Sequence, residues 1–538
     1  MLGFIKYFFC FFDYNIKKFI FHNRKLFINK NSNRNIVLFD FSENKQCHIP
    51  YSYAANILSS KYNAQLTLFK ADIALNSFKN IIFHIFFFFS IFPFSIYKSF
   101  GVRNNVFYKF SMKDKRISLA LLKKIKKKIN SKEDILNIKI DKITIGDLIY
   151  DHYLKLYRLP TIDFHDKKFI NFLYKSILIF TFWENFFKEN NVKAVSVTHA
   201  VYLTGIPARI AIFRKIPVYH MNLTGLFKLD LVNDRPYIDF KYFKKTFSQL
   251  SASKRKNLMK MSKQRINLRI NKSKIGVDMN YSKKSAWIKK INQNNVLIAN
   301  NRVKILIAAH CFFDSPHGYG NMIFPDFYEW IDFLGKLSNK TDYDWYIKTH
   351  PDYLPENKNI INYFLNKYPK FNLLDSNTSH HQIINDGINY VLTCHGTVGF
   401  EYAIMNVPVI NASLNNPHIN YDFNIHATNI ENYKKILTNL TKIKINIKKK
   451  EIYKYYAMRF LDSKIDYIFD NTNKIFKKYD YKTESLPSDI YSDFIRYWSP
   501  FKHKKIVNVI NNFFNSGDYQ LQKRHFLDKN IYSQHVNK

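Results

Sequence analysis

Short apolar runs alternate with helix-length amphipathic segments in two separate stretches of this chain, which is the pattern of parallel α/β units. In the first stretch the pattern predicts two strand-helix-strand units, at 36–41, 48–62 and 64–69 and again at 194–199, 208–214 and 216–220. We therefore predict one Rossmann-like α/β domain over residues 34–225.

The second stretch predicts another α/β domain, over residues 301–440. Its strands are expected at 303–310, 345–348, 389–394 and 407–411, with helix-like segments between them. The remaining parts are an aromatic and basic segment at 1–33, a polar helical and linker region at 226–300, and a basic helical region at 441–538. No tandem repeat is evident.

The first candidate site is the seven-residue run from His395 to Glu401, HGTVGFE, which follows a predicted strand and opens a predicted helix. Unpaired N–H groups and the helix dipole at such a position favour a phosphate. The residues expected to hold it are His395, Gly396, Thr397, Val398 and Gly399. Glu401, one turn on, is placed to accept hydrogen bonds from a ribose diol. The alternative is a glycine-containing turn with Thr397 as a helix cap.

The second candidate site is Lys348-Thr349-His350-Pro351, at the end of another predicted strand. An ammonium and an imidazole there would neutralise a phosphate, while Pro351 stops the strand and directs His350 outward. The carboxyl ends of parallel strands share one edge of a sheet, so this motif and the HGTVGFE run are expected to serve one ligand.

Three further carboxylate and histidine motifs qualify these expectations. The loop after the strand at 303–310 carries His310, Asp314 and His317, as acid/base groups or donor contacts, with a zinc site as the weaker alternative. Asp147 and Asp151 are spaced i, i+4, so one is a candidate general base and both are otherwise helix-surface carboxylates. The D-x-D at 342–344 precedes a strand, at its amino end, and is interpreted as a turn.

The order of these motifs resembles the nucleotide-binding half of GT-B glycosyltransferases, and in particular the bacterial capsule and surface-polysaccharide group that includes Kdo-transferase-like and polysialyltransferase-like enzymes. The resemblance covers 303–412 well and 34–440 loosely. It implies two Rossmann-like domains facing across a cleft, with C-terminal helices that cross back. It also implies that His350, Pro351 and Thr397 bind the donor phosphate and that Glu401 lies near the ribose. Many relatives carry a serine pair where this chain has Gly396-Thr397.

Charge and cysteine content bear on partners and compartment. With 83 Lys and Arg against 41 Asp and Glu in 538 residues, the net charge is +42. Such a charge favours anionic partners; the alternative is that compositional drift has placed the extra lysines on solvent-exposed surfaces. The apolar run 81–97 is expected to be interfacial or buried rather than transmembrane, and the lysine-rich run 123–128 suits an anionic leaflet. The cysteines form no C-x-x-C pair, which fits a reducing cytoplasm; they are Cys10, Cys47, Cys311 and Cys394.

The predicted activity is metal-independent glycosyl transfer from a CMP-, UDP- or GDP-sugar to a bacterial surface polysaccharide or lipid-linked glycan. His350, His310 and Asp314 are the candidate catalytic residues. The nucleotide sugar is a cosubstrate, no cofactor is expected, and the location is cytoplasmic, peripheral to the plasma membrane. The alternatives are a CDP-alcohol polyol-phosphate transferase, a nucleotide-sugar epimerase, or a basic protein without catalysis. No nucleic-acid-binding motif is present, so nucleic acid is not an expected partner.

Overall fold

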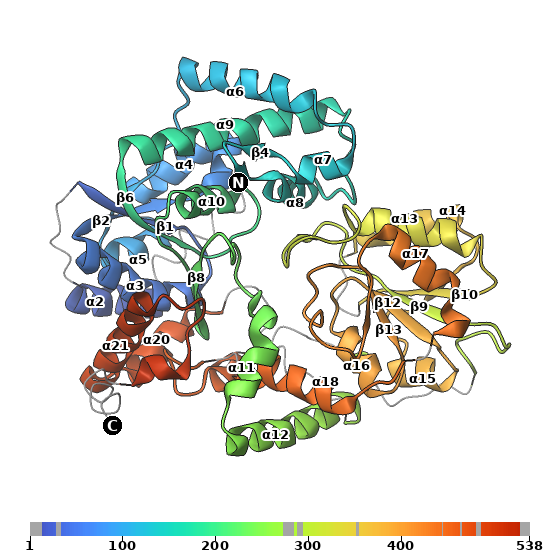
Figure 1. The fold of residues 1–538 in the computed structure, drawn as a ribbon. Helices are drawn as coiled ribbons and strands as arrows, with labels where there is room; N and C mark the ends of the chain where they lie inside the picture. The colour runs from blue at the N-terminus through green and yellow to red at the C-terminus, as the bar shows by residue number, and fades with distance from the viewer. Residues whose placement is uncertain are drawn as a thin grey trace. The chain divides into compact units, whose positions relative to one another are not determined.

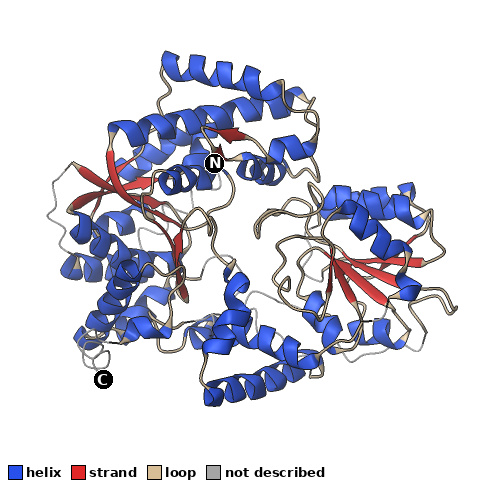
Figure 2. Cartoon of the chain, in the orientation of Figure 1, coloured by secondary structure: helices blue, strands red, loops and turns tan. Residues whose placement is uncertain are grey.

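The computed structural model describes residues 13–27, 34–272, 285–287, 294–350, 355–443, 445–462, 465–479 and 486–527. The chain forms two compact units. Unit 1 comprises Met1–Ile149, Phe164–Pro236 and Lys464–Lys538, and unit 2 comprises Tyr150–Asp163 and Tyr237–Ser463. Each unit contains its own six-stranded sheet (Figures 1 and 2).

The sheet of unit 1 has the strand order β3-β2-β1-β6-β7-β8, and every neighbouring pair is parallel except the last, β7 with β8. The strands are β1 (Asn35–Asp40), β2 (Ala64–Phe69), β3 (Val102–Asn105), β6 (Asn191–Val197), β7 (Val218–Asn222) and β8 (Gly225–Leu229). Helix α3 (Lys45–Tyr62) joins β1 to β2, and α10 (Ile206–Phe213) joins β6 to β7. The two predicted strand-helix-strand units are therefore present.

The C-terminal segment packs on the first sheet's helices. Helices α20 (Asp489–Tyr497) and α21 (Pro500–Ser516) contact α3, and α20 also contacts α2 (Tyr14–Leu26). The Tyr491 ring stacks on Phe19 with 4.4 Å between centroids, and its hydroxyl lies 2.6 Å from His48 Nδ1. These buried contacts make residues from the far end of the chain part of the unit 1 core.

The apolar run 81–97 forms parts of two short helices, α4 (Ser77–Phe88) and α5 (Phe94–Ser99). Long helices α6 (Met112–Lys126) and α9 (Lys167–Glu189) pack on each other, and the basic run 123–128 lies on the exposed end of α6. Between them lie α7 (Lys132–Leu136), β4 (Lys139–Ile140), β5 (Ile143–Thr144) and α8 (Gly146–Tyr157). Among the helices in the described ranges, none has the length and apolar character needed to cross a membrane.

The sheet of unit 2 is parallel throughout and has the order β11-β10-β9-β12-β13-β14. Its strands are β9 (Lys304–Ala308), β10 (Asp344–Lys348), β11 (Phe371–Leu374), β12 (Tyr390–Thr393), β13 (Val409–Asn411) and β14 (Ile425–His426). Helices α13 (Phe327–Ser338), α14 (Asn357–Lys367) and α17 (Ile430–Thr438) lie on one side of it (Figure 1). Helices α15 (His380–Asn385) and α16 (Val398–Ile404) lie on the other. Because helices cover both faces of this sheet, side chains on both sides of the inner strands are buried, and these strands are therefore mostly apolar, as is usual for parallel sheets.

Numbered along the chain, each sheet has the order 3-2-1-4-5-6 of a Rossmann fold. The predicted fold class, two Rossmann-like units with C-terminal helices that return to the first, is confirmed. The predicted linker region contains β8, which belongs to unit 1, and the helices α11 (Phe243–Gln249) and α12 (Ala252–Ile270), which belong to unit 2. Unit 2 also takes in residues 150–163 and α18 (Lys449–Tyr456).

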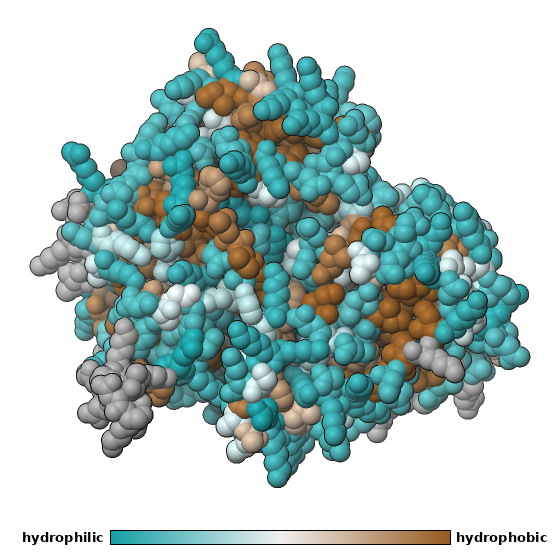
Figure 3. All heavy atoms as spheres, in the orientation of Figure 1, coloured by the Kyte–Doolittle hydropathy of each residue, from teal (hydrophilic) through white to brown (hydrophobic). Residues whose placement is uncertain are grey.

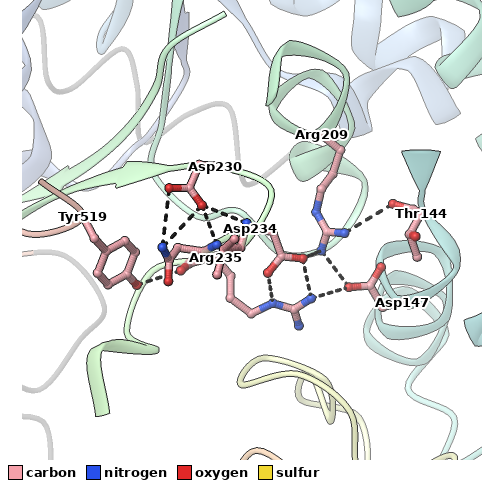
Figure 4. Close-up of polar contacts among 9 residues, drawn as sticks. Thr144, Asp147, Arg209, Asp230, Asp234, Arg235 and Tyr519 are labelled. Atoms are coloured by element: carbon pink, nitrogen blue, oxygen red, sulfur yellow. Dashed lines mark hydrogen bonds and ion pairs between the residues drawn. The ribbon is translucent and has the colours of Figure 1, made fainter. Parts of the chain in front are cut away.

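A buried ion network holds the start of α8 in unit 1 (Figure 4). Asp147 Oδ2 accepts hydrogen bonds from Arg209 at 2.8 Å and from Arg235 at 3.0 Å. Asp234 pairs with the same two guanidinium groups, at 3.0 and 2.8 Å. Asp147 is therefore neither a helix-surface carboxylate nor a general base, because its charge is committed to two arginines.

We expect Asp147→Ala to lower the free energy of unfolding by about 3 kcal/mol, because it leaves two largely buried guanidinium groups with one carboxylate between them. Urea denaturation followed by circular dichroism measures this. The matched control is Asp342→Ala, whose side chain is 80% exposed in its pair with Arg302 and which should change stability by less than about 0.5 kcal/mol. Equal effects of the two substitutions would contradict a structural role for the network.

Candidate functional site

The strand order places a topological switch point between β9 and β12 of unit 2. These strands are neighbours in parallel register, with Leu306 opposite Val391 and Ile307 opposite Leu392, and β10 lies on the other side of β9. The connections that leave β9 and β12 run in opposite directions across the sheet, and ligands of open α/β sheets bind at that divergence. The residues that follow the two strands are His310 on one side and the HGTVGFE run on the other.

His310 is held against the end of β12. The Cys394 amide donates to its Nε2 at 3.1 Å, and the Thr393 hydroxyl lies 3.0 Å from the same atom. Burial, followed by the charges of His395 and His350, holds the pKa of His310 well below its usual value. The ring is therefore neutral with Nε2 as acceptor, which leaves the proton on Nδ1. The imidazole ring of His310 stacks on the ring of Phe327, with 4.6 Å between the two ring centroids.

His395 is the second imidazole of the site. Its ring centroid lies 4.7 Å from that of His310 and 5.1 Å from that of Tyr319. Burial and the neighbouring His317 lower the pKa of His395 to about 4. Its Nδ1 is buried and has no hydrogen-bond partner among the described residues. An unpartnered polar atom in such a position is costly unless something else bonds to it.

The Lys-x-His-Pro motif lies at the end of β10 as predicted, but its lysine is buried while its histidine is exposed. His350 is exposed and lies close enough to His310 to lower its pKa. Lys348 is buried instead: its ammonium donates to the Ser376 carbonyl at 2.7 Å, and burial lowers its pKa to about 8. Lys348 thus supports the connection after β11 rather than facing a ligand. Pro351 lies outside the described residues.

The glycines of the HGTVGFE run serve internal packing. The Gly396 amide donates to Thr393 Oγ1 and the Gly399 amide to the Gly396 carbonyl, each at 3.1 Å. A Cβ on Gly396 would lie 2.9 Å from Thr393 Oγ1, and one on Gly399 would overlap the His418 ring. The amides of Gly396 and Gly399 are therefore not available to the predicted cradle. Thr397 precedes α16, and its side chain makes no capping hydrogen bond.

Glu401 does not have the accessible carboxylate that a ribose contact requires. It is 3% exposed, its Oε1 accepts from Arg269, and its Oε2 accepts from the Trp287 indole at 3.0 Å. Both oxygens are committed, because a buried carboxylate must be paired. The predicted role of Glu401 is corrected to that of an internal anchor for the segments that carry Arg269 and Trp287.

The loop after β9 divides its polar groups between surface and interior. Asp314 is more than half exposed and pairs with Lys155 at 3.2 Å. His317 is buried and its Nδ1 lies 2.6 Å from Asp151 Oδ1. Asp151 therefore orients a histidine that acts electrostatically on His395. The i, i+4 spacing of Asp147 and Asp151 predicted one shared face, but it did not indicate these separate partners.

The D-x-D sequence lies at the amino end of β10, as expected, and both of its carboxylates pair with Arg302, at 3.2 and 3.8 Å. Within the described ranges, no group of three histidine, cysteine or acidic side chains is arranged to hold a metal ion. His310, Asp314 and His317, the residues of the zinc alternative, each have other partners.

The corresponding switch point of unit 1 lies between β1 and β6 and contains a residue that the sequence pattern missed. Asp40 ends β1, and its Oδ2 accepts from the Thr198 hydroxyl at 2.5 Å and from the Thr198 amide at 3.2 Å. Burial, and to a lesser degree the charge of Asp72, raise the pKa of Asp40 to about 7. Its Oδ1 is buried and has no hydrogen-bond partner among the described residues. The available signal was an aspartate inside the apolar run IVLFDF.

The raised pKa of Asp40 predicts a specific pH dependence of stability. In the folded state this carboxyl keeps its proton up to about pH 7, whereas in the unfolded chain it loses the proton near pH 3.8. The contribution of Asp40 to the free energy of unfolding therefore falls as pH rises from 3.8 to 7 and is constant above pH 7. Asp40→Asn mimics the protonated form at every pH. Its free energy of unfolding, measured relative to that of wild type, should therefore increase by about 2–3 kcal/mol when the pH is raised from 5 to 8. Urea denaturation of both proteins across this range measures it. A constant difference would show that Asp40 has an ordinary pKa.

Comparison with known proteins gives only distant likenesses to solved structures. No family model and no curated protein matches the chain. Among solved structures, the β-Kdo 2,4 transferase KpsC of Thermosulfurimonas dismutans is 11% identical, with a TM-score of 0.31 over 49% of this chain and 79% of its own. The UDP-GlcNAc 2-epimerase of Neisseria meningitidis is 11% identical, with a TM-score of 0.21 over 79% and 93%. The wall teichoic acid polymerase TagF is 11% identical, with a TM-score of 0.20 over 91% and 96%.

The strand orders and the C-terminal return define the class of this chain, a two-unit α/β protein of the GT-B type. At 11% identity and TM-scores below 0.5, the solved structures add nothing about its substrate or reaction. A function must therefore be argued from the residues at the switch points.

Proposed function

We propose that the β9/β12 switch point of unit 2 binds the phosphate of a nucleotide sugar and that the protein transfers the sugar to a glycan or lipid-linked acceptor. The observation that carries this proposal is the neutral, tautomer-fixed His310 beside His395 and the start of the HGTVGFE run, at the place where a Rossmann-order sheet binds ligands. The Nδ1–H of His310, the Thr397 hydroxyl and the Thr397 and Val398 amides are the donors offered to phosphate.

In the reaction, the bond between the sugar's anomeric carbon and the phosphate oxygen breaks, and a bond from that carbon to the acceptor oxygen forms. Negative charge develops on the leaving phosphate, and preorganised donors stabilise it by about 3 kcal/mol each. His350, which lies near His310, would add a proton or a hydrogen bond to the leaving group. This scheme assigns no role to a metal ion.

The acceptor hydroxyl must lose a proton as it attacks. Asp314 of the loop after β9, predicted from the sequence, is our candidate to receive it, because its carboxylate lies in the same unit as the phosphate site and is more than half exposed. It pairs with Lys155 at 3.2 Å.

Nucleotide binding is tested by thermal unfolding with CMP, CDP, UDP and GDP. We expect one nucleotide to raise the midpoint by a few degrees at about one hundred times its Kd. His310→Ala should weaken that nucleotide's binding by about tenfold or more, because it removes a donor and the partner of the Cys394 amide. The control is His165→Ala, an exposed histidine of unit 1. The phosphate site is refuted if no nucleotide shifts the midpoint or if His310→Ala retains the full shift.

The reaction itself needs a separate measurement. With a panel of nucleotide sugars and a glycan acceptor, transfer releases free nucleotide in amounts equal to the glycosylated product. A polyol-phosphate transferase would release CMP from a CDP-alcohol only, and an epimerase would interconvert sugars without an acceptor. Asp314→Asn should abolish most of the transfer while leaving nucleotide binding intact. Transfer undiminished by Asp314→Asn would assign the base to another residue.

A further inference from the structure

Helix α4 of unit 1 is apolar on two opposite faces. Phe83 and Phe87 point into the unit and are 7% and 6% exposed. The other face carries large apolar side chains in solvent: Phe78, Ile81, Ile85, Phe88 and Phe89, with exposed fractions of 64, 47, 40, 71 and 67%. Scattered exposed apolar residues are ordinary, but four on one helix and a fifth at its C-cap, Phe89, are not.

The spacing of these residues makes them one continuous stripe, which we call the α4 stripe. At about 100° per residue, positions 78, 81, 85, 88 and 89 fall within an arc of about 100°, opposite the buried face. Phe107, which is 40% exposed and contacts His84 of α4 with 5.1 Å between centroids, extends the apolar surface at one edge. The visible face in Figure 3 is mostly hydrophilic, with its hydrophobic residues gathered in patches.

The charged residues of the chain segment that carries the α4 stripe, between Asp72 and Asp114, are all basic. From 73 to 113 the sequence contains no Asp or Glu, whereas it contains five basic residues, Lys79, Lys98, Arg103, Lys109 and Lys113. The Lys98 ammonium donates to the Phe88 carbonyl at 3.1 Å and to Ser90 Oγ at 2.9 Å, so a cation is fixed at the end of the stripe. A segment of some forty residues that has no acidic group and exposes phenylalanines suits a partner that is both apolar and anionic.

We propose that the α4 stripe docks on the surface of a membrane that contains anionic phospholipid. With 12 residues, about 18 Å long, α4 is too short to span a bilayer but suits a helix lying in the headgroup region. Its phenylalanines enter the acyl boundary, and the flanking lysines meet phosphate groups, each attracted by about 1 kcal/mol near such a surface. Docking there would bring unit 1 to a lipid-linked acceptor, but it does not depend on the proposed transferase activity.

Co-sedimentation of the full chain with vesicles tests this docking without an activity assay. Wild type should bind vesicles of equal parts phosphatidylcholine and phosphatidylglycerol, bind phosphatidylcholine alone much more weakly, and dissociate from the mixed vesicles in high salt. Phe78→Ser/Phe88→Ser should lower the partition coefficient for the mixed vesicles by at least about tenfold. Both side chains are exposed, so the double variant should keep the wild-type unfolding midpoint.

The matched control is Phe501→Ser, at a phenylalanine of α21 that is 76% exposed, in the same unit but outside the stripe. It should bind vesicles as wild type does. The proposal is overturned if wild type does not bind the anionic vesicles, or if the control and the double variant lose binding equally. It is also overturned if light scattering shows a dimer that only the double variant abolishes while vesicle binding is absent, since the stripe would then be an interface between copies of this chain.

Discussion

The candidate site of this protein depends on the parallel pairing of β9 with β12. This pairing is a crossover: the chain leaves β9 toward β10 and β11 and returns to the opposite side of β9 to form β12. It brings His310 against the backbone of Cys394, residues 84 positions apart in the chain, and the amide of Cys394 fixes the histidine's tautomer. If β12 were displaced, His310 would lose that donor and the site would lose the defined orientation of its Nδ1–H.

A second constraint explains why several expected ligand groups do not face a ligand. Buried polar groups must be hydrogen-bonded, and the protein meets this requirement first with its own side chains. Lys348 bonds to a carbonyl, Glu401 to an arginine and an indole, and Gly396 to a threonine hydroxyl. What remains for a ligand is the small set of polar atoms that no internal partner uses, and among the described residues the buried His395 Nδ1 is one of them.

The two units use the same geometry with different chemistry. Both have Rossmann strand order, and in both a polar residue ends the first strand or follows it at the switch point. In unit 2 burial keeps His310 and His395 neutral, so each ring has one N–H donor and one acceptor nitrogen near neutral pH. In unit 1 burial raises the pKa of Asp40, which favours proton exchange near neutrality.

The sequence by itself determined the four inner strands of each sheet and the α/β class of both units, because the alternation of apolar runs and helical segments is a local property of the chain. It also placed His310, His350 and the HGTVGFE run at strand ends. It did not indicate the edge strands β3, β8, β11 and β14. It did not determine which groups would face a ligand, since that depends on partners far away in the chain: Arg269 for Glu401, Ser376 for Lys348, Thr198 for Asp40. Only the tertiary structure decided those pairings, because burial and hydrogen bonding are properties of the packed chain.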